Sequence, residues 1–462
     1  MNVRYIVLLS AISLIAAEAC DINVEDGGDI SYEDAANKEV TFPELETFYP
    51  EEDVPSQGKS PKRGICTNFR HRDASGTALM PSVLGDGVSW CYNWAHTPLD
   101  SGTWATLLDN GMTCYPMVWN AGFSQENIAT FMAADPNSDY VLAYNEPNLK
   151  DQANMTPSQA AEAWPRFVAA AKSLGLKIVG PAVNYGTLEG YGDPVVWYDE
   201  FLAQPGVSLD DIDAIALHSY MPSGEALKTL MIRKFKKYGK PIWLTEYANG
   251  EAQSVSAQMQ FCQESTIYIE ADPMVEKYAW FMDSTGFSNA PHFPMVNYVG
   301  TSVAITDLGR LYTGLSTLDK DHYYSVDVNI PAEHYTGQVI EETAGEDNWG
   351  EYVETNLTED HLGNLEIRNL SGTKWVEYNI DIPATSKYRI DLRYRAAIES
   401  VIKIDCEGAI SAIATLPATT ELQPYTTYGV EMTLPAGKNT VRLTVPTGSL
   451  NLNWLRFTSP LD

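Results

Sequence analysis

From residue 62 onward, short apolar runs rich in β-branched residues alternate with stretches in which apolar side chains recur every three or four positions. The short runs predict buried strands and the longer stretches predict amphipathic helices. The clearest helices are Pro157–Leu174, Glu225–Tyr238 and Val255–Asp272. The predicted strands are Arg63–Phe69, Val88–Trp94, Thr113–Trp119, Tyr140–Tyr144, Lys177–Val183, Ala214–Tyr220, Pro241–Tyr247 and Lys277–Met282. This α/β alternation over about 250 residues predicts a (β/α)8 TIM barrel, closed by a helix at Asp307–Thr313. A doubly wound sheet is the main alternative, but it often has a glycine-rich phosphate loop, which is missing here.

After about residue 320 the pattern changes to short strands of alternating polarity, separated by turn residues. These strands are Trp375–Ile382, Lys387–Tyr394, Val401–Asp405, Gly429–Leu434, Thr440–Val445 and Leu452–Phe457. The pattern predicts an all-β jelly-roll sandwich. We therefore expect two folded domains, at residues 60–320 and 321–462.

The charge of the chain limits the class of ligand. The 462 residues contain 30 Lys and Arg against 61 Asp and Glu, a net charge of −31. This excludes a protein that binds nucleic acid through bulk charge, because phosphate contacts need clustered cations. Residues 21–55 hold twelve acidic side chains and one basic side chain, without hydrophobic periodicity. We expect residues 20–59 to form a solvated, self-repelling tether.

The N-terminus has the features of a secretory signal at residues 1–19: Arg4, an apolar run from Tyr5 to Ala17, and small residues before Cys20. The run is too short to span a bilayer as a helix. Ala17 and Ala19 suit ordinary signal peptidase, whereas Cys20 as the new first residue resembles a bacterial lipoprotein. The Leu usual three places before that Cys is absent, but the acidic segment after Cys20 resembles the export signal of Bacteroidetes surface lipoproteins. We favour an exported cell-surface or outer-membrane lipoprotein over a freely secreted one, with membrane contact only through a lipid on Cys20.

Two glutamates lie where barrel strands end. Glu146 follows the fourth predicted strand and Glu246 lies at the end of the seventh. Reactive groups of TIM barrels sit at this C-terminal face, and a carboxylate pair is what glycosidic cleavage needs. A single glutamate at a strand end is an ordinary polar residue and does not indicate catalysis. The two glutamates together do indicate it. Pro147 is expected to end its strand and to hold Glu146 in an extended conformation.

Longer motifs surround both glutamates. They are Ser89–Trp94, Tyr115–Trp119, Tyr144–Asn148, Gln152–Pro157, Gly180–Val183, His218–Tyr220 and Pro241–Tyr247. Together they resemble glycoside hydrolase family 128, a clan A family that cleaves β-1,3-glucans. The chain departs from the family at Asn148, where Asp is commoner, and at Ser219, where a Trp is expected.

The resemblance implies roles for individual residues. Glu146 would be the general acid/base and Glu246 the nucleophile, with carboxyl groups about 5–5.5 Å apart as in retaining enzymes. Asn145 would bind the 2-hydroxyl of the reacting sugar and Tyr220 would donate to Glu246. The other candidates have a structural alternative: His218 as a core histidine, and Trp280, Trp94 and Trp119 as packing residues rather than sugar platforms.

The C-terminal domain contains ordered landmarks: Ile330–Tyr335, Asn348–Tyr352, Trp375–Tyr378, Leu434–Gly437 and Leu450–Trp454. They resemble a carbohydrate-binding module of family 6. The resemblance implies that Tyr352 and Tyr425 sandwich a sugar and that Asn451 binds its hydroxyls. Trp375 and Trp454 lie in alternating strands and are interpreted as core. Glu333 would take part in a structural calcium site, although Pro331 and Asn453 stand where carboxylates are common. A spacer domain without ligand is the alternative.

Taken together, the sequence predicts an exported, retaining endo-β-1,3-glucanase that acts on laminarin- or curdlan-type β-glucan. The alternatives are another clan A endo-glycosidase, for mannan, xylan or galactan, and a non-catalytic surface glycan-binding lipoprotein. No motif requires a cofactor, and we expect a monomer.

Overall fold

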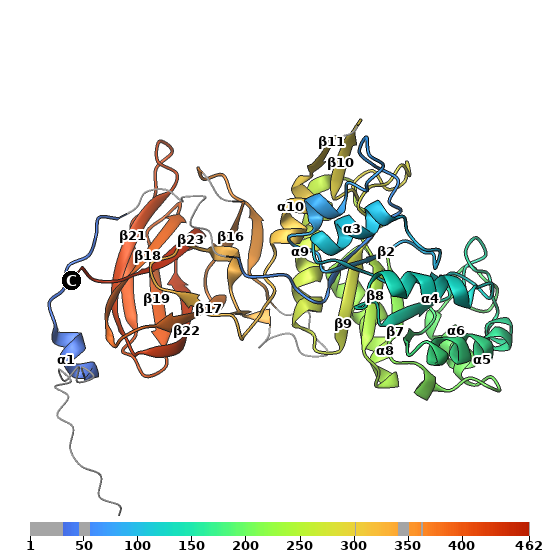
Figure 1. Cartoon of the computed structure of the whole chain (residues 1–462). Coiled ribbons are helices and arrows are strands. Elements are labelled where there is room, and N and C mark those ends of the chain that lie inside the picture. The colour runs from blue at the N-terminus through green and yellow to red at the C-terminus, as the bar shows by residue number, and fades with distance from the viewer. Residues whose placement is uncertain (1–30, 46–55, 301, 341–350, 362–363, 462) are drawn as a thin grey trace, which may run out of the picture.

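The computed structural model describes residues 31–45, 56–300, 302–340, 351–361 and 364–461. The predicted signal peptide and Cys20 lie outside these residues. Figure 1 shows an α/β domain and an all-β domain side by side. No described helix combines the length and apolar character needed to cross a bilayer. The predicted limits of the two domains remain predictions.

The α/β domain is built on parallel strands. They are β1 (Arg63–Cys66), β2 (Trp90–Tyr92), β3 (Thr113–Cys114), β4 (Met117–Val118), β5 (Tyr140–Ala143), β6 (Lys177–Val179), β7 (Ile215–Ser219), β8 (Ile242–Tyr247) and β9 (Val275–Trp280). One sheet has the order β3-β2-β1-β9-β8-β7 and a second has the order β4-β5-β6. Isolated parallel bridges join Val179 to Ala214 and Val183 to Leu217, between the two sheets.

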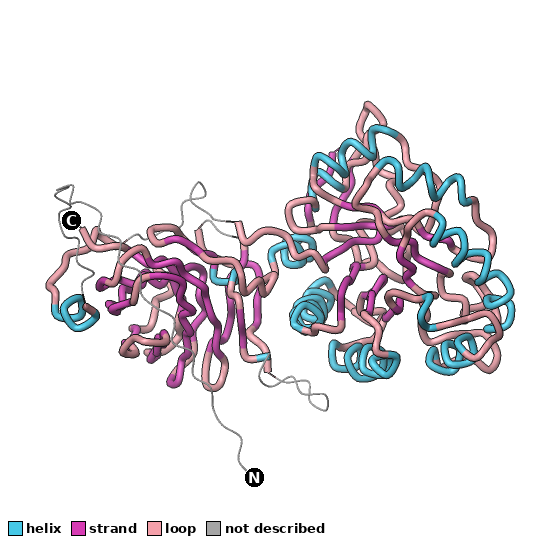
Figure 2. Tube along the Cα trace, turned by 60° about the horizontal axis from the view of Figure 1, so that its bottom comes forward, coloured by secondary structure: helices cyan, strands magenta, loops and turns pink. Residues whose placement is uncertain are grey.

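Helices lie around the outside of these strands (Figure 2). They are α2 (Pro81–Leu84), α3 (Ser101–Asp109), α4 (Gln125–Ala134), α5 (Pro157–Ser173), α6 (Pro194–Leu202), α7 (Gly224–Ala226), α8 (Arg233–Phe235), α9 (Val255–Ala271) and α10 (Asp307–Gly314). An antiparallel hairpin, β10 (Val296–Val299) and β11 (Ser302–Ile305), precedes α10. The predicted closing helix is confirmed as α10.

Two predicted elements are interrupted. The predicted strand Thr113–Trp119 is split into β3 and β4 around Pro116, because proline has no N–H to continue a ladder. The predicted helix Glu225–Tyr238 contains a π-helical turn at Leu227–Ile232 between α7 and α8. Both predictions placed the element correctly and missed the break.

The interior of the α/β domain is packed with large rings. Trp90, Tyr115 and Trp243 are buried against one another, and the Lys277 ammonium lies 5.5–5.9 Å from the three ring centroids. These residues belong to the first halves of their strands or lie just after a short one. They fill the N-terminal end of the strand bundle.

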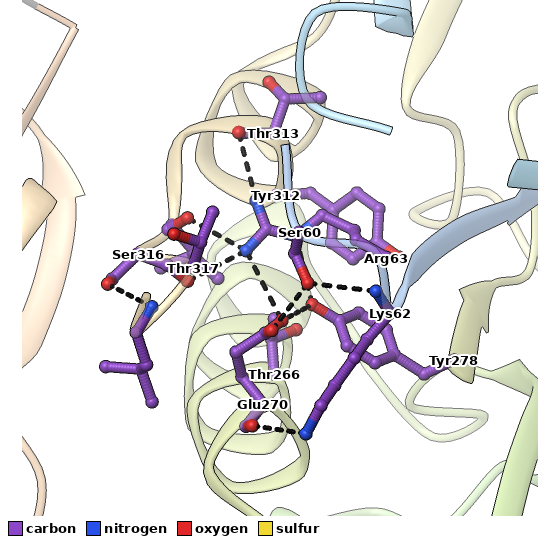
Figure 3. A network of polar contacts seen from close by, with 12 residues as sticks. Ser60, Lys62, Arg63, Thr266, Glu270, Tyr278, Tyr312, Thr313, Ser316 and Thr317 are labelled. Atoms are coloured by element: carbon purple, nitrogen blue, oxygen red, sulfur yellow. Dashed lines mark hydrogen bonds and ion pairs between the residues drawn. The ribbon is translucent and has the colours of Figure 1, made fainter. Parts of the chain in front are cut away.

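A buried polar network ties β1 to the link between the domains (Figure 3). The Arg63 guanidinium donates to the carbonyl oxygens of Thr313, Leu315 and Ser316 at 2.9–3.1 Å. Its charge lies 3.8 Å from Glu270, whose other oxygen accepts from Ser60 at 2.5 Å. Arg63 therefore fixes the chain at the point where it leaves α10 for the second domain.

The all-β domain consists of two facing sheets. Its strands are β12 (Tyr324–Ser325), β13 (Ile330–Pro331), β14 (Gly337–Gln338), β15 (Glu354–Leu357), β16 (Leu365–Leu370), β17 (Trp375–Ile382), β18 (Ser386–Arg395), β19 (Ser400–Cys406), β20 (Ala412–Leu416), β21 (Thr426–Leu434), β22 (Gly437–Thr447) and β23 (Leu450–Thr458). One sheet has the order β12-β17-β22-β19-β20 and the other β15-β16-β23-β18-β21. Trp375 and Trp454 are buried, as predicted.

The described part of the acidic N-terminal segment is not a free tether. Residues Tyr32–Asn37 form helix α1, and the Tyr32 hydroxyl donates to the carbonyl of Thr433. Thr41 pairs with Leu461 as an antiparallel bridge, and Arg389 donates to the carbonyl of Pro43. Residues 31–45 are thus anchored on the second domain although most of them are exposed, and the tether over residues 20–59 stays a prediction.

The two domains share a packed interface. The Thr355 N–H donates to the Gln263 side chain of α9 at 2.7 Å, in a buried position. Tyr352 and Leu357 of the second domain pack against the hydrophobic core of the first. The second domain is therefore held against α9 and α10 by both polar and apolar contacts.

Candidate active site

The two predicted carboxylates lie at the C-terminal ends of parallel strands, Glu146 just after β5 and Glu246 within β8. The Glu146 N–H donates to the carbonyl of Ala182, next to β6, at 2.8 Å. Glu146 has φ +43° and Tyr144 has φ +35°, so the expectation that Pro147 keeps Glu146 extended is wrong. Positive φ is costly for such residues and persists only where the surroundings impose it.

Glu246 is held by three hydrogen-bond donors and lies near His218. Its Oε1 accepts from the Tyr92 hydroxyl at 3.1 Å and from the Trp94 indole at 2.7 Å. Its Oε2 accepts from the Tyr220 hydroxyl, as predicted for that residue, and lies 3.3 Å from His218 Nδ1. Burial and the charge of Glu146 raise the pKa of Glu246 above its usual range, while the charge of His218 and these hydrogen bonds oppose the shift.

Glu146 is 6% exposed and uses one oxygen for two contacts. Its Oε1 lies 3.0 Å from His218 Nδ1 and accepts from the Asn184 amide at 3.3 Å. Asn184 follows β6 and was not singled out from the sequence, because an Asn in a loop carries no motif by itself. The preceding residue, Asn145, donates to Gln152 at 3.1 Å.

His218 lies between the two carboxylates. Its side chain is fully buried, and one atom from each of Glu146, His218 and Glu246 can be chosen so that all three lie within 4.8 Å of one another. Burial lowers the pKa of His218, but the charges of Glu246 and Glu146 and the hydrogen bond to Glu146 outweigh it and raise the pKa. The structure therefore places His218 in the site rather than in the apolar core.

The arrangement suits a proton better than a metal ion. A metal on His218 Nδ1 would require the proton to move to Nε2, which is buried without a hydrogen-bond partner among the described residues. Metal-bound histidines almost always donate that second N–H to a partner. With a proton on Nδ1 instead, that N–H lies 3.0 Å from Glu146 Oε1 and 3.3 Å from Glu246 Oε2.

Trp280 is not the sugar platform. Its side chain is fully buried, its indole donates to the carbonyl of Phe293, and its ring packs edge-on against Tyr247. The next residue, Phe281, is half-buried, with its ring 5.7 Å from Trp94 and 5.5 Å from Tyr220. Phe281 directly follows the last residue of β9, so an error of one residue exchanged a ring of the core for a ring beside the site.

The other two tryptophans differ. Trp94 is half-buried, adopts φ +60°, and bonds Glu246 directly. Trp119 is also half-buried, but its described contacts include no hydrogen bond to either carboxylate. The structure thus brings Trp94 to the pair through a polar contact, whereas a platform role for either ring remains a prediction.

The predicted sugar site of the second domain does not assemble as expected. Tyr352 faces the first domain. Tyr425 is 2% exposed and donates to Glu366 at 2.6 Å. The predicted sandwich of a sugar between these two rings does not form in this structure, because the Tyr425 ring is buried and Tyr352 packs against the other domain. Asn451 also contacts Glu366, at 3.2 Å, and lines a cleft of about 570 Å³ together with Arg368 and Arg395.

Glu333 lies between the domains. It is 4% exposed, its Oε2 has no partner among the described residues, and burial, followed by the charge of Glu366, raises its pKa to about 8. A cavity of about 670 Å³ there is lined by Glu333 and Asn453 of the second domain and by Asp86 and Arg310 of the first.

Comparison with known proteins agrees with this geometry. The glycosyl hydrolase catalytic core family matches residues 66–312. The chain belongs to this family. Residues 325–459 match the carbohydrate-binding module of family 6, so both predicted resemblances are confirmed. The catalytic core is 35% identical to a family 128 (subgroup II) endo-β-1,3-glucanase of Pseudomonas viridiflava, over 56% of this chain and 98% of that one, with a TM-score of 0.49.

Two further relatives extend the comparison. A family 128 (subgroup II) endo-β-1,3-glucanase of Sorangium cellulosum is 30% identical over 55% of this chain and 97% of that one, with a TM-score of 0.47. Alkali-sensitive linkage protein 1 of Schizosaccharomyces pombe is 24% identical over 248 residues, half of this chain. The match spans 41% of that relative's length.

Proposed function

We propose that this member of the glycosyl hydrolase catalytic core family is a retaining endo-β-1,3-glucanase. The observation that carries the proposal is the buried pair Glu146 and Glu246, joined through His218. Glycosidic cleavage needs one carboxyl group as acid and another as nucleophile or base. The names of the two subgroup II relatives support β-1,3-glucan as the substrate.

The contacts of each glutamate suggest its role. Glu246 accepts hydrogen bonds from two tyrosines and one tryptophan, and donors to a carboxylate stabilise its ionised form. It is suited to attack the anomeric carbon as the nucleophile. Glu146, with one oxygen uncommitted among the described residues, is suited to protonate the leaving oxygen and then to deprotonate the water that releases the sugar.

The short separation supports retention of configuration. An inverting enzyme needs room for a water between substrate and base, with carboxyl groups roughly 6.5–9.5 Å apart, whereas a retaining pair is about 5–5.5 Å apart. Here an oxygen of each glutamate lies within 4.8 Å of the other and both reach the same histidine nitrogen. Asn145, beside Glu146, is proposed to bind the 2-hydroxyl of the reacting sugar.

The closure of the first domain into a barrel and the jelly-roll topology of the second are also proposed. We propose that the two parallel sheets close into one (β/α)8 barrel, supported by the bridges Val179–Ala214 and Val183–Leu217 and by the direct succession of β3 and β4. The two facing sheets of the second domain are proposed to be a jelly roll. Its cleft beside Asn451 would then bind glucan.

Export, lipidation of Cys20 and a monomeric state also remain proposals, supported by sequence features alone. A calcium ion at Glu333 belongs with them. The unpartnered Glu333 oxygen favours it, but calcium takes six to eight oxygen ligands, and Glu333 is the single carboxylate of the second domain that lines the described cavity.

Product analysis on linear β-1,3-glucan tests the function, with mannan and xylan as control substrates. We expect β-1,3-oligosaccharides of several lengths from the start of the reaction, as endo action requires. Proton NMR of the first products should show the β-anomer before mutarotation. The α-anomer would contradict retention, and hydrolysis of β-1,4 polymers alone would contradict the substrate. Binding without any cleavage would support a surface glycan-binding protein instead.

A further inference from the structure

Asn184 contacts Glu146 in a fixed orientation. Its Nδ2 donates to Glu146 Oε1 at 3.3 Å, and its Oδ1 accepts from the Tyr185 N–H at 2.8 Å. An amide can exchange its oxygen and nitrogen by rotation, and the hydrogen-bond partners decide which position each takes. With its oxygen accepting from the Tyr185 N–H, Asn184 turns its own N–H toward Glu146.

Glu146 Oε1 therefore faces two N–H donors, Asn184 Nδ2 and His218 Nδ1. A hydroxyl hydrogen on that oxygen would compete with both donors for its lone pairs. The geometry points to Asn184 as a positioning residue of the proposed reaction: together with His218 it keeps Oε1 unprotonated and assigns the transferable proton to Oε2. This inference rests on the proposed function, because it gives the acid a defined reacting oxygen.

Asn148 holds Asn184 in place. Its amide donates to the carbonyls of Asn184 at 2.6 Å and Tyr191 at 3.3 Å, and its own carbonyl accepts from Thr187 and Leu188. Asn148 is fully buried. Since its two partners are carbonyl acceptors, a carboxylate at this position would have nothing to donate. This accounts for Asn148 where Asp is commoner in the resembling family.

A glycine makes this close packing feasible. A Cβ at position 186 would lie 2.4 Å from the Asn148 carbonyl oxygen and 2.5 Å from its Nδ2, far inside contact distance. Asn148, Gly186 and Asn184 thus fasten the loop after β6 to the segment that follows Glu146. The acid and its N–H donor are consequently positioned by the same pair of loops.

Loss of the Asn184 hydrogen bond should shift the pH dependence of kcat/KM in one direction. The charged or titratable groups facing Glu146 are His218 and Tyr220, which lie on or just after β7, and Glu246 on β8. The Asn184 N–H stabilises the ionised carboxylate of Glu146, so its removal favours the protonated acid. The acid must be protonated at the start of the reaction. The alkaline limb of kcat/KM therefore moves to higher pH.

The test compares three variants of the full chain on linear β-1,3-glucan oligosaccharides. For Asn184→Ala we expect the alkaline limb to rise by about one pH unit, with kcat lowered roughly tenfold and KM within twofold. Asn184→Asp should raise the limb further, because it adds a negative charge beside Glu146. Asn148→Asp should shift it in the same direction by less.

Asn249→Ala is the matched control. Asn249 is a buried asparagine after β8 whose amide donates to the carbonyl of Pro222 and whose oxygen accepts from Glu251, without contact to either carboxylate. It should leave the pH profile unchanged. Melting temperatures of all variants show whether a change in the alkaline limb comes from misfolding or from the loss of the Asn184 contact.

Different outcomes contradict different claims. An unshifted alkaline limb in a folded, active Asn184→Asp protein overturns the role of Asn184 and leaves the proposed function intact. A shift of equal size in Asn249→Ala also overturns it, because the effect would then be general. If the unchanged protein does not cleave β-1,3-glucan, the proposed function fails and the positioning role fails with it.

Discussion

The two predicted sugar sites of this protein turned out differently. In the first domain, Glu146, His218 and Glu246 come from three strand ends that are far apart in sequence and meet within hydrogen-bonding distance. In the second domain, Tyr352 faces the neighbouring domain and Tyr425 is buried. Of the three residues predicted to bind sugar there, Asn451 lines the described cleft.

The difference follows from what positions each side chain. Parallel strands bring their C-terminal ends to one edge whatever the loops do, so residues at strand ends meet almost by necessity. Aromatic residues on loops or at strand entries depend on how the surrounding segments pack. In this chain Tyr352 packs against the neighbouring domain, and the Tyr425 hydroxyl donates a hydrogen bond to Glu366.

The largest effect is expected from a change of Glu246, which tests whether the site of the first domain is the reactive one. Glu246→Gln removes the proposed nucleophile while keeping a side chain of the same shape, and kcat on β-1,3-glucan should fall by about 10⁴-fold. Binding of laminari-oligosaccharides, measured by calorimetry, should remain close to that of the unchanged protein. Near-normal hydrolysis by this variant would reject the assignment.

A pair of neighbouring variants would sharpen the assignment of the aromatic ring in that site. Phe281→Ala removes the ring beside Trp94 and Tyr220 and should raise KM about tenfold. Trp280→Phe removes buried surface instead and should lower the melting temperature with KM nearly unchanged. The opposite pattern, measured by steady-state kinetics and thermal denaturation, would restore Trp280 as the platform.

In the second domain, Tyr352 at the domain interface can be compared with Asn451 at the cleft. Tyr352→Ala should lower the stability of the full chain by about 1–3 kcal/mol, because a half-buried ring at the domain interface is lost. Its affinity for soluble β-1,3-glucan should not change, whereas Asn451→Ala should weaken binding while leaving the melting temperature alone. A loss of glucan affinity in Tyr352→Ala would show that this ring binds sugar after all.

The smallest expected effect concerns Glu333. Its pKa of about 8 in the folded protein lies above the ordinary value of 4.5, so its contribution to stability is present below about pH 4.5 and is lost as the pH rises through 8. Glu333→Gln should raise the melting temperature at pH 8 in the presence of a chelator and have little effect at pH 5. If calcium binds there, adding it should stabilise the unchanged protein at pH 8 but not this variant.

The sequence anticipated the parallel strands of the first domain and the carboxylate pair, because the strands depend on hydrophobic periodicity and the pair lies at strand ends. It failed where a single residue decides the outcome. Trp280 is the last residue of β9 and is buried in the core, whereas Phe281, the next residue, has its ring beside Trp94. The positive φ of Glu146 and the contacts of Asn184 arise from packing between loops, which no local pattern records.

The N-terminal segment described above sets where the protein could be held. Ser31 is already part of the cap of α1, and the segment that follows lies on the second domain. If a lipid is attached at Cys20, only eleven Cα-to-Cα steps separate it from Ser31, or about 40 Å at full extension. The binding module would then be the part of the molecule held nearest to the cell surface, and the catalytic domain would reach outward from it. Such an enzyme would act on glucan that comes within one molecular length of the cell.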